Sequence, residues 1–407
     1  MGSSATVRAV NRLAARWAGP AEGDSTVFMP AGVWPLLAFL ATGAHGPAVA
    51  ELEDALGMRR DEAGRHARDL LTTLRTLPGS SAAVGLWTSD LIRLEPSWLA
   101  GLPADVHGVL TGVEPEDRRR LDAWAARNTD GLIESMPVAV EPDTRLVLAS
   151  ALSVSTDWIR PFHTTYYRPS DGPWTAEGYA FLARTTGLLD RVAVAATPAG
   201  QLTELRVLGG NGIDVHLLLG EEGAKPGAVL DAGLGILDRT HARVTGDLLP
   251  TGRPGPGLEV TRIRSEHREH MLRVAVPAFT IRADHDLLAR PEVFGLATAA
   301  SAAAPAGHFP GITTAEPLSI GSGRQSATAA FGPDGFRAAA VTAFGAVGAG
   351  LPDLRYRVKS VAVAFDRPFG FLAVRRTSRL VLAAGWVAEP QAAVEPEWDD
   401  PDEFDDY

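Results

Sequence analysis

Few side chains in this sequence are of the types that catalyse reactions or hold metals. The chain has no cysteine, which excludes disulfides, thiol nucleophiles, iron–sulfur clusters and cysteine-based zinc sites. His267 and His270 lie close together, but no third ligand follows at a fixed spacing, so a solvated turn is the better interpretation. The Gly-x-Ser-x-Gly motif is absent, and no Ser-His-Asp triad can be singled out. We therefore expect no metal, no cofactor and no catalytic residue.

A run of small residues suggests chemistry of another kind, the binding of phosphate by backbone amides. Ala338–Ala343 consists of alanine, valine and threonine, and glycines follow at 345, 348 and 350. The likeness to a phosphate-binding loop is superficial, because these glycines neither follow a short strand nor open a helix. A flexible loop explains the composition better.

The charge of the chain argues against nucleic acid as a partner. The formal net charge is −11, but eight acidic residues and no basic one fall within 391–407, so the rest of the chain is near neutral. A nucleic-acid surface would require an excess of positive charge. Arg118–Arg120 are basic, but Glu114, Glu116 and Asp117 precede them, which favours a charged helix start over a polyanion site.

The acidic segment 391–407 leaves two interpretations open. Its acids are interrupted by Trp398, Phe404 and Tyr407, and such a peptide could dock on a basic surface of a partner. Segments of this composition more often form a solvated, disordered end, and we prefer that interpretation.

Helices are expected in the first part of the chain. Val7, Val10, Leu13 and Trp17 recur at spacings of three and four, which predicts an amphipathic helix ended by Gly19-Pro20. A short strand is expected at 26–28. Further helices are expected at 33–44, 47–57, 67–77 and 121–133. No apolar run is long enough to span a membrane.

Strands are expected to dominate the second part. The segment 146–154 is apolar on both faces, which is typical of a strand in the middle of a covered sheet. Similar runs lie at 215–219, 272–281, 369–374 and 380–387, and a polar turn between the last two predicts a hairpin. Helices first and strands afterwards indicate an α+β fold. We expect a single domain over 1–390, followed by the acidic tail 391–407.

Four separated segments together resemble the serpin family of serine protease inhibitors, in the family's order. They are Phe28-Met29-Pro30-Ala31-Gly32-Val33 with Glu51-Leu52; Trp124 to Leu148, continuing to Trp158 and Phe162; Val274-x-Val276-Pro277-x-Phe279; and Phe365-x-x-Pro368-Phe369-x-Phe371 to Pro390. The resemblance implies three β-sheets, about nine helices and an exposed reactive-centre loop before the C-terminal strands. Every basic residue except Lys225 and Lys359 is arginine, a bias typical of GC-rich genomes, so a bacterial member of the family is expected.

The resemblance implies protease inhibition by a single conformational change. In inhibitory serpins a protease cleaves the loop, which then inserts as a new central strand of the largest sheet and distorts the acylated enzyme. The hinge of the loop must consist of small residues, because alternate side chains enter a packed interior. The hinge positions of this chain are Gly335, Phe336, Arg337, Ala338, Ala339, Ala340, Val341 and Thr342.

The hinge and the sheet beneath it depart from the family's usual pattern. Phe336 stands where the family has threonine or serine, and a ring in a space shaped for a hydroxyl is expected to cost about 1–3 kcal/mol on insertion. Pro333 replaces a glutamate and removes a backbone donor. The polar cluster that lets the sheet open, called the shutter, differs too. Together with Trp158 at the top of the sheet, its positions are Met29, Gly32, Ser150 and Gln325. We therefore expect insertion to be slow or incomplete.

Two scissile bonds fit the loop. Counting forward from Gly335 by the family's spacing gives Ala349-Gly350, which suits an elastase-like or subtilisin-like enzyme with a small specificity pocket. Counting backward from Phe365 gives Arg357-Val358, which suits a trypsin-like enzyme. The two counts disagree, so the loop is longer than the family norm. We favour Ala349-Gly350, because the length between hinge and cut decides whether the loop can insert.

The expected function is a serine protease inhibitor that acts as a suicide pseudo-substrate through a loop at about 335–357. Its partner would be a serine protease that accepts small residues before the cut. The inhibitor would be a monomer in the cytoplasm, or secreted after loss of a signal peptide. Two alternatives stay open: a non-inhibitory binder of a small molecule or partner, and a biosynthetic enzyme on the same scaffold.

Overall fold

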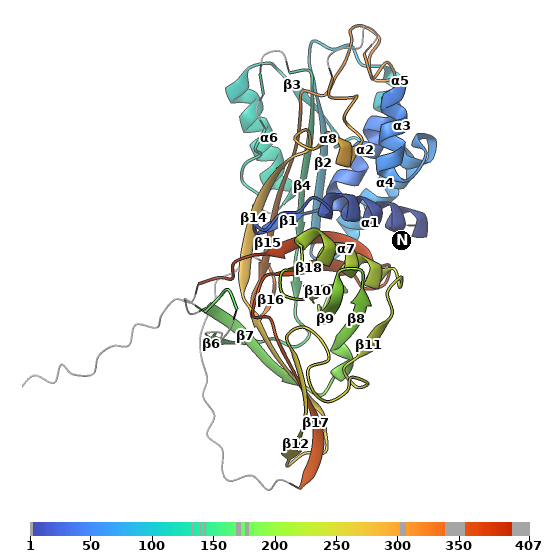
Figure 1. Ribbon diagram of the computed structural model, residues 1–407. Coiled ribbons are helices and arrows are strands. Elements are labelled where there is room, and N and C mark those ends of the chain that lie inside the picture. The colour runs from blue at the N-terminus through green and yellow to red at the C-terminus, as the bar shows by residue number, and fades with distance from the viewer. Residues whose placement is uncertain are drawn as a thin grey trace, which may run out of the picture.

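The computed structural model describes residues 3–129, 131, 133–138, 140–141, 144–167, 172–175, 179–301, 307–337 and 355–392 (Figure 1). Eight α-helices lie in these ranges, against about nine expected. They are α1 (Ser4–Ala18), α2 (Pro30–Gly43), α3 (Pro47–Leu56), α4 (Arg60–Thr76), α5 (Pro96–Gly101), α6 (Glu114–Asn128), α7 (Pro226–Leu237) and α8 (Pro291–Phe294). No helix among the described residues is long and apolar enough to cross a membrane.

The first helices follow the local signals of the sequence. Ser3 caps α1, since its hydroxyl accepts a hydrogen bond from the Thr6 amide. α2 is buried along nearly its whole length. α3 begins with Pro47 in its first turn and ends at Gly57, whose φ of 62° is the left-handed conformation that favours glycine. These helices are confirmed, with boundaries shifted by a few residues.

The largest sheet, the central sheet, has the strand order β3-β2-β4-β15-β16-β5, with β14 paired to β15. Its strands are β2 (Ser80–Ser89), β3 (His107–Leu110), β4 (Leu146–Val154), β5 (Thr156–Asp157), β14 (Phe279–Asp286), β15 (Ser322–Phe331) and β16 (Gly335–Phe336). Helices α2 and α4 pack against one face of this sheet, and α6 packs against the other (Figure 1).

Two further sheets complete the fold. One has the order β1-β19-β18-β10-β9-β8-β11 and the other β12-β17-β13-β7-β6. The strands of the first are β1 (Thr26–Phe28), β8 (Val192–Thr197), β9 (Gly200–Leu208), β10 (Ile213–Leu219), β11 (Arg243–Thr245), β18 (Phe369–Arg375) and β19 (Leu380–Val387). Those of the second are β6 (His163–Tyr167), β7 (Tyr179–Thr186), β12 (Leu258–Ser265), β13 (Met271–Pro277) and β17 (Tyr356–Ala364).

Strand β4 shows why its sequence is apolar on both faces. Leu148 and Leu152 belong to the main hydrophobic core, whereas Val147, Ala149 and Ala151 belong to a separate core. This second core includes Leu121 and Trp124 of α6. The prediction of a covered central strand is confirmed.

Two expected elements differ in the structure. The run 272–281 is not one strand, because β13 ends at Pro277 and β14 begins at Phe279 in another sheet. Ala278 lies between them and donates its amide to the Ala180 carbonyl. The helix expected at 121–133 spans Glu114–Asn128 instead, and acidic residues occupy its first turn, where the helix dipole favours them.

The expected domain boundary at residue 390 lies close to the end of the regular backbone pairing. The Gln391 amide donates to the Ala278 carbonyl, and Ala392 forms an isolated bridge with Tyr179. Residues 393–407, the rest of the predicted tail, lie outside the described residues.

Candidate functional site

The central sheet is open between its two middle strands. β4 and β15 pair in parallel only where Val147–Ala151 face Ser322–Ser326. Beyond this register a narrow gap of about 20 Å³ is lined by Leu152–Ser155, Thr328 and Ala330, together with Ile133 and Arg337. Another strand could therefore enter the sheet at this point.

Gly335 and Phe336, the first residues of the predicted hinge, already lie at one end of this gap. Phe336 pairs with Phe331 of β15, and β16 also pairs with Thr156 and Asp157 of β5. Both pairings are antiparallel. β16 is thus a strand of two residues held between two neighbours of the central sheet.

Phe336 is fully buried, which differs from the expectation of a space shaped for a hydroxyl. Its ring centroid lies 6.0 Å from that of Phe371, and Phe279 lies 5.1 Å from Phe371. Phe279 in turn stacks on Phe331 at 5.5 Å. The neighbouring side chains form an aromatic cluster that accommodates the ring, so the expected steric cost of burying Phe336 does not arise.

Glycine is required at position 335 because the backbone of β5 approaches it closely, not because its own backbone angles are unusual. A Cβ atom at this position would lie 2.3 Å from the carbonyl oxygen of Thr156 and 3.2 Å from the Cα of Asp157. Real Cβ atoms do not approach backbone atoms so closely, and neither neighbour can move without breaking β5. Only glycine fits between these strands.

Trp158 fixes the turn that leads into β16. Its indole Nε1 donates to the Gly332 carbonyl at 2.9 Å, and its backbone amide donates to the Asp334 carbonyl at 2.8 Å. The Pro333 carbonyl accepts from the Phe162 amide at 2.9 Å. Pro333 lacks a donor, but its carbonyl contributes to holding the turn. The sequence-predicted Trp158 therefore lies directly against the hinge.

The Arg337 side chain points away from the aromatic cluster that holds Phe336. Its guanidinium forms an ion pair with Asp157 at 3.1 Å, and both side chains are largely exposed. Phe336 inside and Arg337 outside follow the alternation of a strand. The next predicted hinge residues, Ala338–Thr342, and the favoured scissile bond Ala349-Gly350 lie outside the described residues.

The alternative scissile bond lies inside a regular strand. Arg357 and Val358 belong to β17, where they face Arg264 and Ile263 of β12, and Val358 is buried. A protease would have to separate β17 from β12 to bind this bond as an extended substrate.

The four expected shutter positions meet in the structure. The Gln325 amide clamps Met29: Oε1 accepts from the Met29 amide at 2.8 Å, and Nε2 donates to its carbonyl at 2.9 Å. Nε2 also lies 3.4 Å from Ser150 Oγ. A Cβ on Gly32 would lie 2.6 Å from Ser150 Oγ, so glycine makes room for this hydroxyl. The cluster joins α2 to β4 and β15 at the part of the sheet where these two strands pair.

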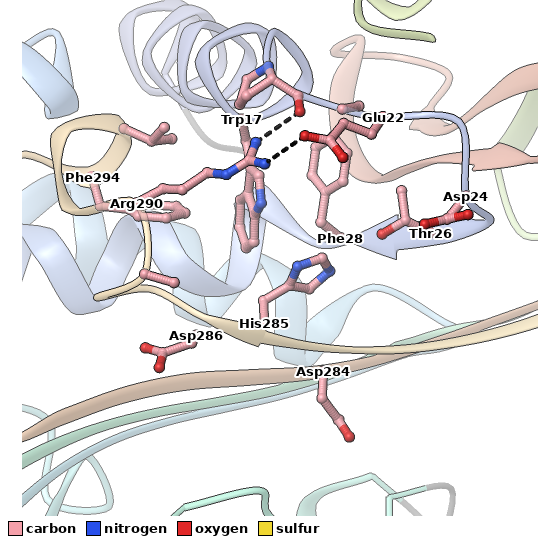
Figure 2. Close-up of a pocket in the computed structure, with 14 residues that line it drawn as sticks. Trp17, Glu22, Asp24, Thr26, Phe28, Asp284, His285, Asp286, Arg290 and Phe294 are labelled. Atoms are coloured by element: carbon pink, nitrogen blue, oxygen red, sulfur yellow. Dashed lines mark hydrogen bonds and ion pairs between the residues drawn. The ribbon is translucent and has the colours of Figure 1, made fainter.

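A pocket of about 290 Å³ lies beside this cluster (Figure 2). His285, opposite Gln325 in the β14–β15 register, forms a hydrogen bond with the Val27 carbonyl at 2.7 Å, and burial lowers the pKa of His285. Figure 2 shows Arg290 reaching to Glu22, at 3.4 Å. Asp284 accepts from Ser326, and Asp286 pairs with Arg324. Glu22, Asp284, Asp286 and Arg290 of this pocket each already have a partner.

Sequence reasoning missed several partners of the hinge. Thr156 and Asp157 form β5, and Phe331 and Phe371 build the aromatic cluster. Arg184 places its guanidinium 4.2 Å from the Phe162 ring centroid, and burial and neighbouring arginines lower the pKa of Arg184 to about 10. No motif marks Thr156, Asp157, Phe331 or Arg184, and Phe371 belongs to the C-terminal motif only, which does not show that it contacts the hinge. The site contains no arrangement for covalent catalysis among its described residues, but it can admit a strand.

Comparison with known proteins covers the sequence in part and the fold almost completely. Residues 5–171 match the family model described as serpin (serine protease inhibitor). Serpin-Z2A of rice, Oryza sativa subsp. japonica, is 30% identical over 167 residues, which cover 37% of this chain and 39% of that protein. Plasminogen activator inhibitor 1 of Mus musculus is 28% identical over 165 residues, 36% of this chain and 41% of that protein. The chain thus matches about two fifths of the length of these relatives.

Two solved structures share the fold. Thyroxine-binding globulin in complex with thyroxine has a TM-score of 0.69 at 16% sequence identity, and the match covers 95% of this chain and 99% of that one. Native protease nexin-1 with heparin has a TM-score of 0.68 at 17% identity, and the match covers 95% and 98%. The sequence relatives are from a plant and a mouse, so the bacterial origin stays a prediction. From the arrangement of its three sheets and its likeness to these structures, the chain has the serpin fold, and its residues 5–171 are similar to the serpin family.

Proposed function

We propose that this chain is a serine protease inhibitor that acts as a suicide pseudo-substrate, with residues 335–357 as its reactive loop. The observation that carries the proposal is the position of β16. Two hinge residues already pair with β15 and β5, in the direction that an inserted strand would continue.

The small residues after β16 support insertion into the gap. Below Phe336 the gap is narrow, so large side chains would not enter it. Alanine, valine and threonine at 338–343 suit such a space. Each backbone hydrogen bond gained along β4 and β15 would contribute about 0.5–1.5 kcal/mol, so a fully paired strand would stabilise the cleaved protein strongly.

The length of the loop favours Ala349-Gly350 as the scissile bond. An extended segment from Phe336 to Ala349 spans about 43 Å, whereas the ten residues of β15 span about 30 Å. Cleavage after Ala349 therefore frees enough chain to traverse the sheet. Cleavage after Arg357 would require β17 to give up its pairing. A partner with a small specificity pocket follows from Ala349, and we propose a monomeric inhibitor in the cytoplasm or secreted.

The test is a challenge with elastase-like, subtilisin-like and trypsin-like enzymes, with products separated on a denaturing gel. We expect a covalent complex with an enzyme that cuts after small residues. We also expect the free cleaved inhibitor to unfold tens of degrees above the intact protein. Mass spectrometry of the released C-terminal fragment identifies the cut.

Gly335→Ala is the variant that connects this activity to β16. Its Cβ would collide with Thr156, so we expect less complex, more simple cleavage and a smaller thermal gain. Gly332→Ala is the matched control, because its Cβ would meet only the Gly335 carbonyl, at an ordinary 3.8 Å. If the wild-type protein is cut cleanly within 345–354 with no complex and no change in thermal stability, the proposal is wrong and one of the non-inhibitory alternatives holds.

A further inference from the structure

A pocket of about 770 Å³ lies at one end of the sheet that contains β10, β18 and β19. Leu218 near the end of β10 pairs with Gly370 near the start of β18, and Gly370 also pairs with Trp386 of β19. The loops around these strand ends line the pocket: 220–226, which joins β10 to α7, and 366–368, which joins β17 to β18. The volume falls within the usual range of small-molecule sites, about 300–1,000 Å³. Gly23, Gly172, Pro173 and Trp386 complete the described lining.

Rigid apolar groups form one part of this lining. They are the rings of Pro173, Pro226, Pro368 and Trp386. Pro226 lies in the first turn of α7, and the backbone of Trp386 pairs with β18 on one side and with β1 on the other. Such rings lose little conformational freedom when a ligand binds, so they suit contact with a flat apolar group.

The indole N–H of Trp386 is a donor without an acceptor. Trp386 is 4% exposed, and its Nε1 is buried with no hydrogen bond to any described residue. A buried donor in this state costs about 1–3 kcal/mol relative to one that is satisfied. Because Trp386 lines the pocket, an oxygen atom of a bound molecule would supply the missing acceptor.

The charged groups of the lining differ in how far they are already used. Glu221 accepts from a backbone amide of β9 at 2.9 Å, and Asp366 forms an ion pair with Arg367 at 3.1 Å. The third acid, Glu222, is exposed. Lys225 precedes α7, and no carboxylate of the described chain lies within 4.0 Å of its ammonium group. Two of the three acids are therefore engaged, whereas Lys225 is free to bind an anion.

We propose that this pocket binds a small organic acid that carries one carboxylate on a flat apolar group. The carboxylate accepts from the Trp386 N–H and pairs with Lys225, since contacts to an ionised group are the strong ones. The apolar group lies against the proline rings. The described lining has three acids and two basic residues, so a singly charged carboxylate suits it better than a doubly charged phosphate. The site lies outside the hinge, and the proposal does not depend on protease inhibition.

Calorimetric titration at low ionic strength tests the proposal with three probes of similar shape: 3-phenylpropanoate, 3-phenylpropanamide and 3-phenylpropylamine. We expect saturable binding of the carboxylate, about tenfold tighter than that of the neutral amide, because only the carboxylate gains a charged partner in Lys225. The amine should not bind. No saturable binding of the carboxylate, or equal affinity for the amide or the amine, overturns the proposal.

Trp386→Phe is the decisive variant, because it removes the N–H and keeps an aromatic ring. We expect it to bind 3-phenylpropanoate about tenfold more weakly. Trp87→Phe is the matched control: Trp87 Nε1 is also buried without a hydrogen bond to a described residue, but Trp87 belongs to the second core and does not line the pocket.

A second pair of variants tests the charge. Lys225→Gln should weaken binding of 3-phenylpropanoate about tenfold, since it removes the cationic partner of the carboxylate. Arg119→Gln removes the same charge from an exposed position on α6 and should leave binding unchanged. If each variant and its control weaken binding equally, the pocket is not the site.

The indole N–H resonances of the nine tryptophans provide a direct measurement by nuclear magnetic resonance. The resonance that is missing from Trp386→Phe identifies Trp386, and the one missing from Trp87→Phe identifies Trp87. Saturating 3-phenylpropanoate should move the Trp386 resonance of the wild-type protein to lower field, as a new hydrogen bond does, and leave that of Trp87 in place. A Trp386 resonance that does not move at saturation overturns the proposal. Complex formation with a protease should be the same in all four variants, which separates this site from the inhibitor function.

Discussion

Phe336 and Gly335 show how single residues set the state of the hinge. Glycine lets two backbones approach, and phenylalanine fills a cluster that other serpin-like sequences are expected to build around a hydroxyl. The ring is buried before any cleavage, so the hinge is anchored in the intact protein. If the loop inserts as proposed, Phe336 already occupies the position of its first inserted side chain.

Phe336→Thr should destabilise the protein by about 3 kcal/mol, because it leaves a cavity among Phe371, Phe279 and Phe331. Urea unfolding measures this change. Phe336→Leu, which keeps most of the volume, should cost less than about 1.5 kcal/mol. Equal stability of the wild-type protein and the threonine variant would show that the ring does not occupy the cluster in solution.

Glu204 makes the stability of the protein depend on pH. Burial alone raises the pKa of the Glu204 carboxyl, but the hydrogen bonds and charges of His216 and Arg243 lower it from 4.5 to about 2. Because the unfolded chain binds the proton first as pH falls, the stabilisation is complete above about pH 4.5 and is lost toward pH 2. Its size is on the order of 3 kcal/mol.

Glu204→Gln should therefore be least stable relative to the wild-type protein near pH 6, and the difference should shrink between pH 4.5 and 2. Unfolding free energies across this range provide the measurement. Exposed Glu292→Gln is the control and should show no such convergence. If the difference in unfolding free energy stays constant with pH, His216 and Arg243 do not lower the pKa of Glu204.

At the scale of elements, the boundary of the C-terminal tail lies within the predicted segment 391–407. Gln391 and Ala392 extend the pairing around β7, whereas the acids begin at Glu395. Truncation at two points separates the docked residues from the acidic ones.

Deletion of 393–407 should shift the unfolding midpoint by no more than a degree or two, because it removes none of these backbone pairs. Deletion of 391–407 should lower the midpoint further, since the Ala278 carbonyl and the Ala180 amide lose their partner. Differential scanning calorimetry of the two truncations decides this. A large loss from the shorter deletion would favour the alternative in which the acidic segment docks on the body.

At the scale of the whole molecule, the central sheet combines a closed half and an open half. β4 and β15 are paired where Val147–Ala151 meet Ser322–Ser326, and the gap begins immediately beyond. Beside the paired half, Gln325 accepts a hydrogen bond from the amide of Met29, the residue that precedes α2. One additional strand would pair the backbone groups that face this gap.

Hydrogen exchange should show this division directly. In the intact protein, amides at 152–154 and 327–330 that face the gap should exchange faster than those at 147–151 and 322–326, because they lack a strand partner there. After cleavage at Ala349-Gly350 the two groups should become equally protected. Exchange that does not change on cleavage would contradict loop insertion.

The sequence by itself determined much of this protein. Local signals such as Ser3, Pro47 and Gly57 fixed helix boundaries, and two-faced apolarity identified β4 as a covered strand. The four shutter positions could be located in the sequence because the family's motifs surround them. They lie together in the structure.

Only the tertiary structure decided what those residues meet. The sequence shows that Phe336 is large, but the space that receives it is made by Phe371, Phe279 and Phe331 from other strands. Likewise Pro277 splits one apolar run between two sheets, and five arginines from distant segments converge on one pocket. Periodicity reports which side of an element is buried, whereas the identity of the opposing surface depends on contacts between residues that are far apart in the chain.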